Sequence, residues 1–156
     1  MNLSTLIEQS VDFQKFLNTK MSDVKIETSI TDLFFGEKIQ PVLNKYWAKE
    51  KGVYIFSSIS SEEDVWYIGK ATKKNFASEV WSKLNNRKPP FEQHWRKDDT
   101  ETPDDIKGAL TEGNFNLTLI KINHKKTEMA SLFEVYLQTY FHCNDGKLPI
   151  LNKKIG

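Results

Sequence analysis

Glu134 is the residue whose position in the sequence most clearly indicates a possible functional group. Ala130, Leu137 and Phe141 share a predicted helical face with it, so its carboxylate lies in or beside an apolar stripe. A polar group buried without a partner costs roughly 2–7 kcal/mol, and this carboxylate should therefore bind a cation or a hydrogen-bond donor. Two interpretations stay open: a functional cation site, or a glutamate that reaches solvent or forms a structural salt bridge.

Two tyrosines form a second group of interest. Tyr54 and Tyr67 lie on two short segments rich in β-branched and aromatic residues, and the polar run between the segments predicts a hairpin. Gly69 ends the second segment directly before Lys70, and a glycine there allows the backbone to approach a ligand closely. Tyrosines on a sheet are more often packing residues, so this pair alone indicates no function.

Positive charge is concentrated in one part of a chain whose net charge is only +1. Residues 70–97 hold eight basic residues against two acidic ones, a local charge of +6. Such a segment can attract a polyanion, although a solvated helix face and loop would show the same composition. The basic residues are Lys70, Lys73, Lys74, Lys83, Arg87, Lys88, Arg96 and Lys97.

The elements that must position these residues are predicted by hydrophobic periodicity. The predicted strands are residues 52–57, 64–69 and 115–122, and the predicted helices are residues 76–84, 103–110 and 127–141. They predict an α+β fold, a small three-stranded antiparallel sheet flanked by helices, over a domain of residues 51–156. Residues 1–50 are expected to be an N-terminal extension, with a helix over residues 3–17, packed on that domain.

This arrangement resembles the GIY-YIG nuclease family over roughly residues 50–156. Gly-Val-Tyr at residues 52–54 and Tyr-Ile-Gly at residues 67–69 match its two half-motifs, with the tyrosines 13 positions apart. A helix follows the second half-motif, and then come the late helical Glu134 and, 18 positions later, Asn152. The resemblance implies the same sheet and helices that the periodicity predicts.

The resemblance implies a metal-dependent endonuclease that hydrolyses DNA phosphodiester bonds, with Mg²⁺ or Mn²⁺ as cofactor. Glu134 would be the single metal-ligating carboxylate, with waters and a phosphate completing the coordination shell. Tyr54 or Tyr67 would be the general base, and its pKa of about 10 would have to be lowered by cations such as Lys70. Asn152 would hold the C-terminal segment around the site. The residues expected to contact substrate are Gly69, Lys70, Lys74, Lys83 and Asn152.

One position departs from the family pattern. The family usually has an arginine eight residues after the second glycine, where this chain has Ala77. Arg87, at the end of the same helix, is the leading replacement as phosphate clamp, because a lysine such as Lys74 or Lys83 cannot make a bidentate contact. The missing arginine supports an alternative function: a catalytically inactive GIY-YIG-like module that binds nucleic acid or protein.

The composition excludes several other classes of protein. A chain of 156 residues with 38% hydrophobic and 28% charged positions is neither disordered nor a disulfide-stapled miniprotein. Cys143 is the only cysteine, so no intrachain disulfide can form. The apolar runs are too short to span a bilayer and the N-terminus lacks signal-peptide features, so we expect a cytoplasmic protein without a membrane partner.

Overall fold

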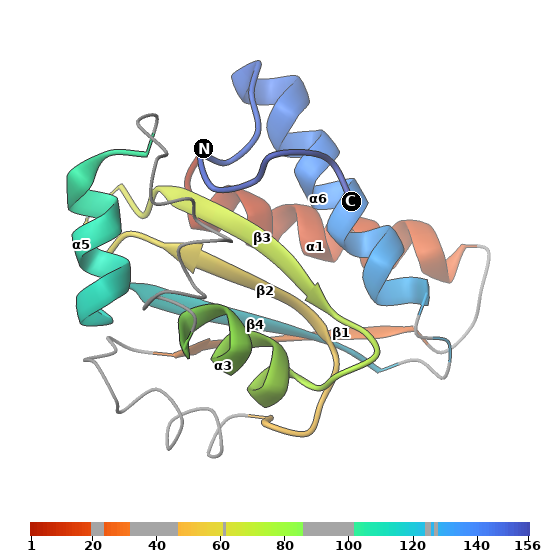
Figure 1. Cartoon of the computed structure of the whole chain (residues 1–156). Helices are drawn as coiled ribbons and strands as arrows, with labels where there is room; N and C mark the ends of the chain where they lie inside the picture. The colour runs from red at the N-terminus through yellow and green to blue at the C-terminus, as the bar shows by residue number, and fades with distance from the viewer. Residues whose placement is uncertain (20–23, 32–46, 61, 86–101, 124–125, 127) are drawn as a thin grey trace.

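A computed structural model describes residues 1–19, 24–31, 47–60, 62–85, 102–123, 126 and 128–156. The described residues form four helices and a four-stranded antiparallel sheet, an α+β fold (Figure 1). The helices are α1 (Leu3–Asn18), α3 (Phe76–Asn85), α5 (Asp104–Glu112) and α6 (Glu128–Asp145), and the strands are β1 (Lys25–Thr31), β2 (Gly52–Ser57), β3 (Val65–Ala71) and β4 (Asn116–Asn123). No helix in these ranges is long and apolar enough to cross a membrane.

The sheet has the order β1-β4-β2-β3, with every neighbouring pair antiparallel. The predicted pairing of the β2 and β3 segments is confirmed, and so is the membership of β4 in the same sheet. The predicted number of three strands is wrong, because β1 adds a fourth strand at the edge of β4. Only two of the seven residues of β1 are apolar, Ile26 and Ile30, so its hydrophobic pattern is too weak to stand out in the sequence.

Helices cover both faces of the sheet (Figure 1). On one face lie α1 and α6, which pack on Val53, Ile55 and Ile68. On the other face α3 and α5 pack on Tyr54 and Phe56. All six residues of β2 are therefore buried, as expected for a central strand covered on both sides.

Two described elements near the N-terminus, β1 and α1, contribute to the sheet and to one helical layer. Helix α1 packs against α6, where the rings of Phe13 and Phe133 stack with centroids 5.0 Å apart. Its N-terminus is capped by the Asn2 side chain, which accepts a hydrogen bond from the Thr5 backbone N–H. The expected helix over residues 3–17 is thus confirmed. The division into an N-terminal extension of residues 1–50 and a domain of residues 51–156 stays a prediction.

The glycine of the first half-motif has a packing role that can be tested. Gly52 has φ +154°, and a Cβ atom there would lie 2.0 Å from the Ile120 backbone oxygen of β4. Gly52→Ala should therefore lower the free energy of unfolding by on the order of 3 kcal/mol, measured by denaturant titration.

Gly108→Ala is the matched control, because no described atom outside its own stretch of α5 lies within 4 Å of a Cβ at this position. It should raise stability by about 0.5–1 kcal/mol through helix propensity. Equal small effects of the two substitutions would contradict the close approach of β2 and β4 at Gly52.

Candidate functional site

The two motif tyrosines lie together on the face of the sheet that α3 covers. Their ring centroids are 5.9 Å apart, and Tyr54 is fully buried whereas Tyr67 is partly exposed. Gly69 is the cross-strand neighbour of Tyr54. A Cβ atom at Gly69 would lie 2.6 Å from atoms of both rings. The space beside this glycine is filled by the tyrosines, and a contact between Gly69 and substrate stays a prediction.

The pKa of Tyr54 is shifted in the direction opposite to that required of a general base. Burial raises it well above the usual value, and the charges of Tyr67, Glu79 and Glu134 add to the rise. The lowering of the pKa that a general base requires is therefore not met at Tyr54, while the alternative assignment of Tyr67 as general base stays a prediction. Lys70 is the cross-strand neighbour of Val53, so its side chain leaves β3 on the α6 face, away from the tyrosine rings.

On the α6 face, Lys70 contacts the carboxylate that the sequence singled out. Glu134 is only 5% exposed, and its Oε2 lies 2.9 Å from the Lys70 Nζ atom. Apart from Lys70, no described group gives this oxygen a hydrogen bond. Glu134 thus has the cationic partner that its burial requires, and this partner comes from the residue directly after the second half-motif.

The ion pair does not fully offset the burial of Glu134. Desolvation raises the pKa of its carboxyl group, and Lys70 and Lys83 lower it by less than burial raises it. An ionised Glu134 is therefore still under-compensated in the folded protein. A further cation beside this carboxylate would be electrostatically favourable.

Lys83 links the tyrosines to the carboxylate. It lies on α3, with its Nζ atom 5.6 Å from the centroid of the Tyr67 ring. The same ammonium group also lowers the pKa of Glu134. Tyr67, Lys83, Lys70 and Glu134 therefore form one electrostatically connected group around the outer edge of β3.

The C-terminal segment runs along that edge and is held by side-chain hydrogen bonds. The Asn152 side-chain amide donates to the Ile68 carbonyl and accepts from the Ile68 N–H, both at 2.9 Å. The Leu151 N–H donates to the Trp66 carbonyl, also at 2.9 Å. Asn152 thus attaches the segment to β3, while its expected contact with substrate stays a prediction.

Gln138 is a residue of this site that the sequence reasoning missed. Its Nε2 donates to the Ile68 carbonyl at 3.1 Å, and its Oε1 accepts from the Gly156 N–H at 2.7 Å. It lies one helical turn after Glu134 and is 1% exposed. A polar residue on an apolar helical stripe was the signal that identified Glu134, and the same signal was present for Gln138.

The remaining predicted residues are less closely connected to this group. Lys74 is exposed between β3 and α3, and Ala77 packs against the core on the α3 face. Arg87 lies outside the described residues, as do Lys88, Arg96 and Lys97. Its expected role as phosphate clamp, and the meeting of the whole basic segment at one site, stay predictions.

The donor set limits how a divalent cation can bind. The described ranges contain no group of three or more His, Cys, Asp or Glu side chains placed to hold a metal ion. A cation at Glu134 would have one protein carboxylate and would need water and phosphate oxygens for the rest of its shell. Mg²⁺ accepts such a shell, so the site fits a metal that binds together with a phosphate-bearing substrate.

The raised pKa of Glu134 predicts a specific pH dependence of stability. The folded protein holds this proton at pH values where the unfolded chain, with its usual pKa of 4.5, has released it. The stability of the native protein relative to the Glu134→Gln variant should therefore fall as the pH rises from about 4.5 to neutral. Denaturant titrations of both proteins across this range measure the difference.

Glu128→Gln, which removes an exposed carboxylate from the same helix, is the matched control. A difference between native protein and Glu134→Gln that stays constant across this pH range would contradict the under-compensated charge at Glu134.

Comparisons with known proteins supply no independent guide to this group of residues. No family model matches the chain, and neither a curated protein nor a solved structure is significantly similar to it. The function of the site must therefore be argued from its own geometry and chemistry.

Proposed function

We propose that this protein is a metal-dependent endonuclease of the GIY-YIG type that hydrolyses phosphodiester bonds in DNA. The observation that carries the proposal is the buried, under-compensated carboxylate of Glu134 beside the residues of the second half-motif. An ordinary structural salt bridge would explain the 2.9 Å contact with Lys70. It gives no reason for a tyrosine pair and Lys83 at the same edge.

The required chemistry matches the groups that are present. Hydrolysis of a phosphodiester needs an activated water, neutralisation of charge on the phosphoryl oxygens and stabilisation of the leaving oxygen. A Mg²⁺ or Mn²⁺ ion held by Glu134 would supply charge neutralisation at the phosphate. Lys70 and Lys83 would bring further positive charge to the same phosphate from β3 and α3.

Of the two tyrosines, Tyr67 is the better candidate for the general base. Tyr54 is fully buried, and a hydrogen bond with Tyr67 contributes to its raised pKa, which favours a protonated Tyr54. A protonated Tyr54 can donate this hydrogen bond to the Tyr67 oxygen and orient it. Tyr67 is also partly exposed and can meet a water molecule directly.

A second function is favoured by one specific observation. The Lys70 ammonium group already contacts the carboxylate oxygen that a divalent cation would use. Together with Ala77 in place of the family arginine, this contact is compatible with a module that binds DNA without cleaving it. A cleaving enzyme requires Lys70 to shift from Glu134 toward the phosphate when metal and substrate bind.

Cleavage of supercoiled plasmid in the presence of Mg²⁺ or Mn²⁺ tests the proposal. The wild-type protein should nick the plasmid, and EDTA should abolish the activity. Glu134→Gln should lower the rate by about 100-fold or more, because it keeps the shape of the side chain and removes the charge that holds the cation. DNA binding through the lysines should largely remain.

The variants are compared at equal concentrations of folded protein, with Glu128→Gln as a control of the same chemical change on α6. Equal nicking by wild type and Glu134→Gln would reject the metal site. No nicking by either protein, with DNA binding intact, would favour the non-cleaving module. Arg87→Ala should also abolish nicking if Arg87 is the phosphate clamp; if it does not, Lys74 is the next candidate.

The different roles of the two tyrosines predict that substituting each of them lowers the cleavage rate by a different amount. Tyr67→Phe should lower the single-turnover cleavage rate by about 10²–10⁴-fold, the usual loss when a general base is removed. Tyr54→Phe should cost less, because it removes only the group that orients Tyr67. A larger loss in Tyr54→Phe than in Tyr67→Phe would reverse the assignment.

A further inference from the structure

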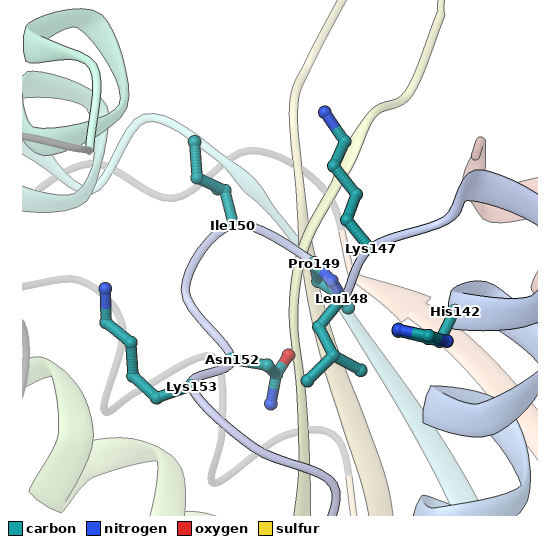
Figure 2. Close-up of a pocket in the computed structure, with 7 residues that line it drawn as sticks. All are labelled: His142, Lys147, Leu148, Pro149, Ile150, Asn152 and Lys153. Atoms are coloured by element: carbon teal, nitrogen blue, oxygen red, sulfur yellow. The ribbon is translucent and has the colours of Figure 1, made fainter.

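Concave surfaces flank α6 on two sides in the described part of the chain. At the C-terminal end of the helix, an open hollow of about 420 Å³ lies beside the loop that follows. Its two lysines, Lys147 and Lys153, point away from each other and do not converge on one ligand (Figure 2). The second surface is a groove of about 450 Å³ between α6 and α1, and its lining is mainly aliphatic and aromatic.

Two antiparallel helices, α1 and α6, form the walls of this groove. Gln9 of α1 accepts a hydrogen bond from the Tyr136 hydroxyl of α6, and one turn later Phe13 packs on Phe133. The helices lie side by side on one face of the sheet (Figure 1). The α6 residues that line the groove fall within 132–143, roughly 16 Å along the helix axis. The groove is therefore long enough for about three turns of a further helix.

Large apolar side chains are exposed on both walls of the groove. Phe16 of α1 is 60% exposed, and Leu132 of α6 is 46% exposed. Tyr136 and Tyr140 line the same groove and are only partly buried. Single exposed apolar residues are common on protein surfaces, whereas a group of them around one groove is typical of an interaction site.

The two helices expose mainly negative charge. Helix α6 has no lysine or arginine, and Lys15 is the only one on α1. Asp12 shares a face of α1 with Phe16, one turn away, and burial together with the charge of Asp12 raises the pKa of Tyr136 in the groove. The exposed acidic residues of the two helices are Glu8, Asp12, Glu128 and Asp145, of which Asp145 pairs with the amino group of Met1. A partner that is complementary to this surface must be both apolar and basic.

We propose that the groove between α1 and α6 binds a basic amphipathic α-helix of a partner protein. The apolar face of that helix packs on Phe16 and Leu132, and lysines or arginines beside this face lie opposite Asp12 and Glu8. The acidic surroundings disfavour DNA and anionic lipid, both of which bind to basic surfaces. They also disfavour a second copy of the chain, which would bring the same acidic helices together.

The groove faces away from the candidate active site. Glu134 and Tyr136 are two residues apart on α6, about 200° around the helix. The carboxylate accordingly contacts Lys70 of β3, whereas the tyrosine hydroxyl contacts Gln9 of α1. A helix bound in the groove leaves the edge of β3 uncovered, so the interaction is independent of the activity proposed for that edge.

Binding of two synthetic peptides to the full chain tests the proposal. One peptide, of about 14 residues or roughly four helical turns, has leucine on one face and lysine on the other. The second peptide has glutamate in place of each lysine. Cys143 is the only cysteine of the chain and lines the groove, so the rate of its reaction with a thiol reagent measures occupancy. The lysine peptide should slow this reaction, less so at high salt, and the glutamate peptide should bind at least about 10-fold more weakly.

Substitutions of exposed residues test the location. Phe16→Ala/Leu132→Ala should weaken binding of the lysine peptide by about 10-fold or more, because it removes the exposed apolar contacts. Val11→Ala is the matched control, since Val11 is 51% exposed on α1 and lies outside the groove lining. Asp12→Lys should weaken binding by about 3-fold. Glu112→Lys, the same change of charge on α5 across the sheet, should leave it unchanged.

Each outcome decides the proposal, with circular dichroism used to check that every variant is folded. Loss of binding in the double variant, with binding kept in Val11→Ala, supports it, and if the double variant is misfolded the contrast between Asp12→Lys and Glu112→Lys decides. Failure of the wild type to bind the lysine peptide, or equal affinity for both peptides, overturns it. Sedimentation of the wild type that shows a dimer absent from the double variant would assign the groove to a second copy and overturn it. Flotation of the wild type, but not of the double variant, with phosphatidylcholine vesicles would assign the groove to a lipid surface, with the same consequence.

Discussion

The antiparallel pairing of β2 with β3 is the constraint on which the rest of the candidate site depends. This register places Tyr54 opposite Gly69 and Val53 opposite Lys70. Because side chains alternate between the faces of a sheet, the tyrosine rings lie on the α3 face and the lysine lies on the α6 face. A slip of one residue would exchange these faces and separate Lys70 from Glu134. The site is therefore built around the edge of β3 rather than on one face of the sheet.

Burial of the Glu134 carboxylate at this edge lowers the stability of the fold, whereas the function proposed for the site requires this carboxylate. Taking Glu134 out of water is unfavourable, and the Lys70 and Lys83 charges offset only part of that cost. A fully apolar helix face would be a simpler way to pack α6 on Ile68 and its neighbours. The fold tolerates the carboxylate because the surrounding aromatic and aliphatic core is large, with both sheet faces covered.

The sequence predicted the helices and three of the strands because each has a clear hydrophobic period. It did not predict β1, whose edge position requires few apolar side chains, so its pairing with β4 becomes visible only in three dimensions. Glu134 was identified as a residue in need of a partner, but that partner, Lys70, is 64 positions away and no local pattern points to it.

The position of Lys70 relative to the tyrosine rings could be predicted in part from the sequence. Tyr67 and Lys70 are three positions apart on one strand, and an odd spacing places two side chains on opposite faces. This odd spacing already indicated that the Lys70 side chain does not lie beside the tyrosine rings. The degree of burial of Tyr54, which dominates its raised pKa, depends on the packing of α3 and could not be read from the motif itself.

The hydrogen bonds of Asn152 have a consequence for the behaviour of this protein in concentrated solution. Strand β3 is the last strand of the sheet formed by the described residues, and an open strand edge is a template for pairing with another chain. The Asn152 side-chain amide forms hydrogen bonds with both the N–H and the carbonyl of Ile68, and the Leu151 N–H donates one to the carbonyl of Trp66. The C-terminal segment thereby acts as a protective cover against self-association at an aromatic-rich edge. Removing it would expose unpaired backbone groups beside Trp66 and Tyr67 and would favour aggregation as well as loss of the site.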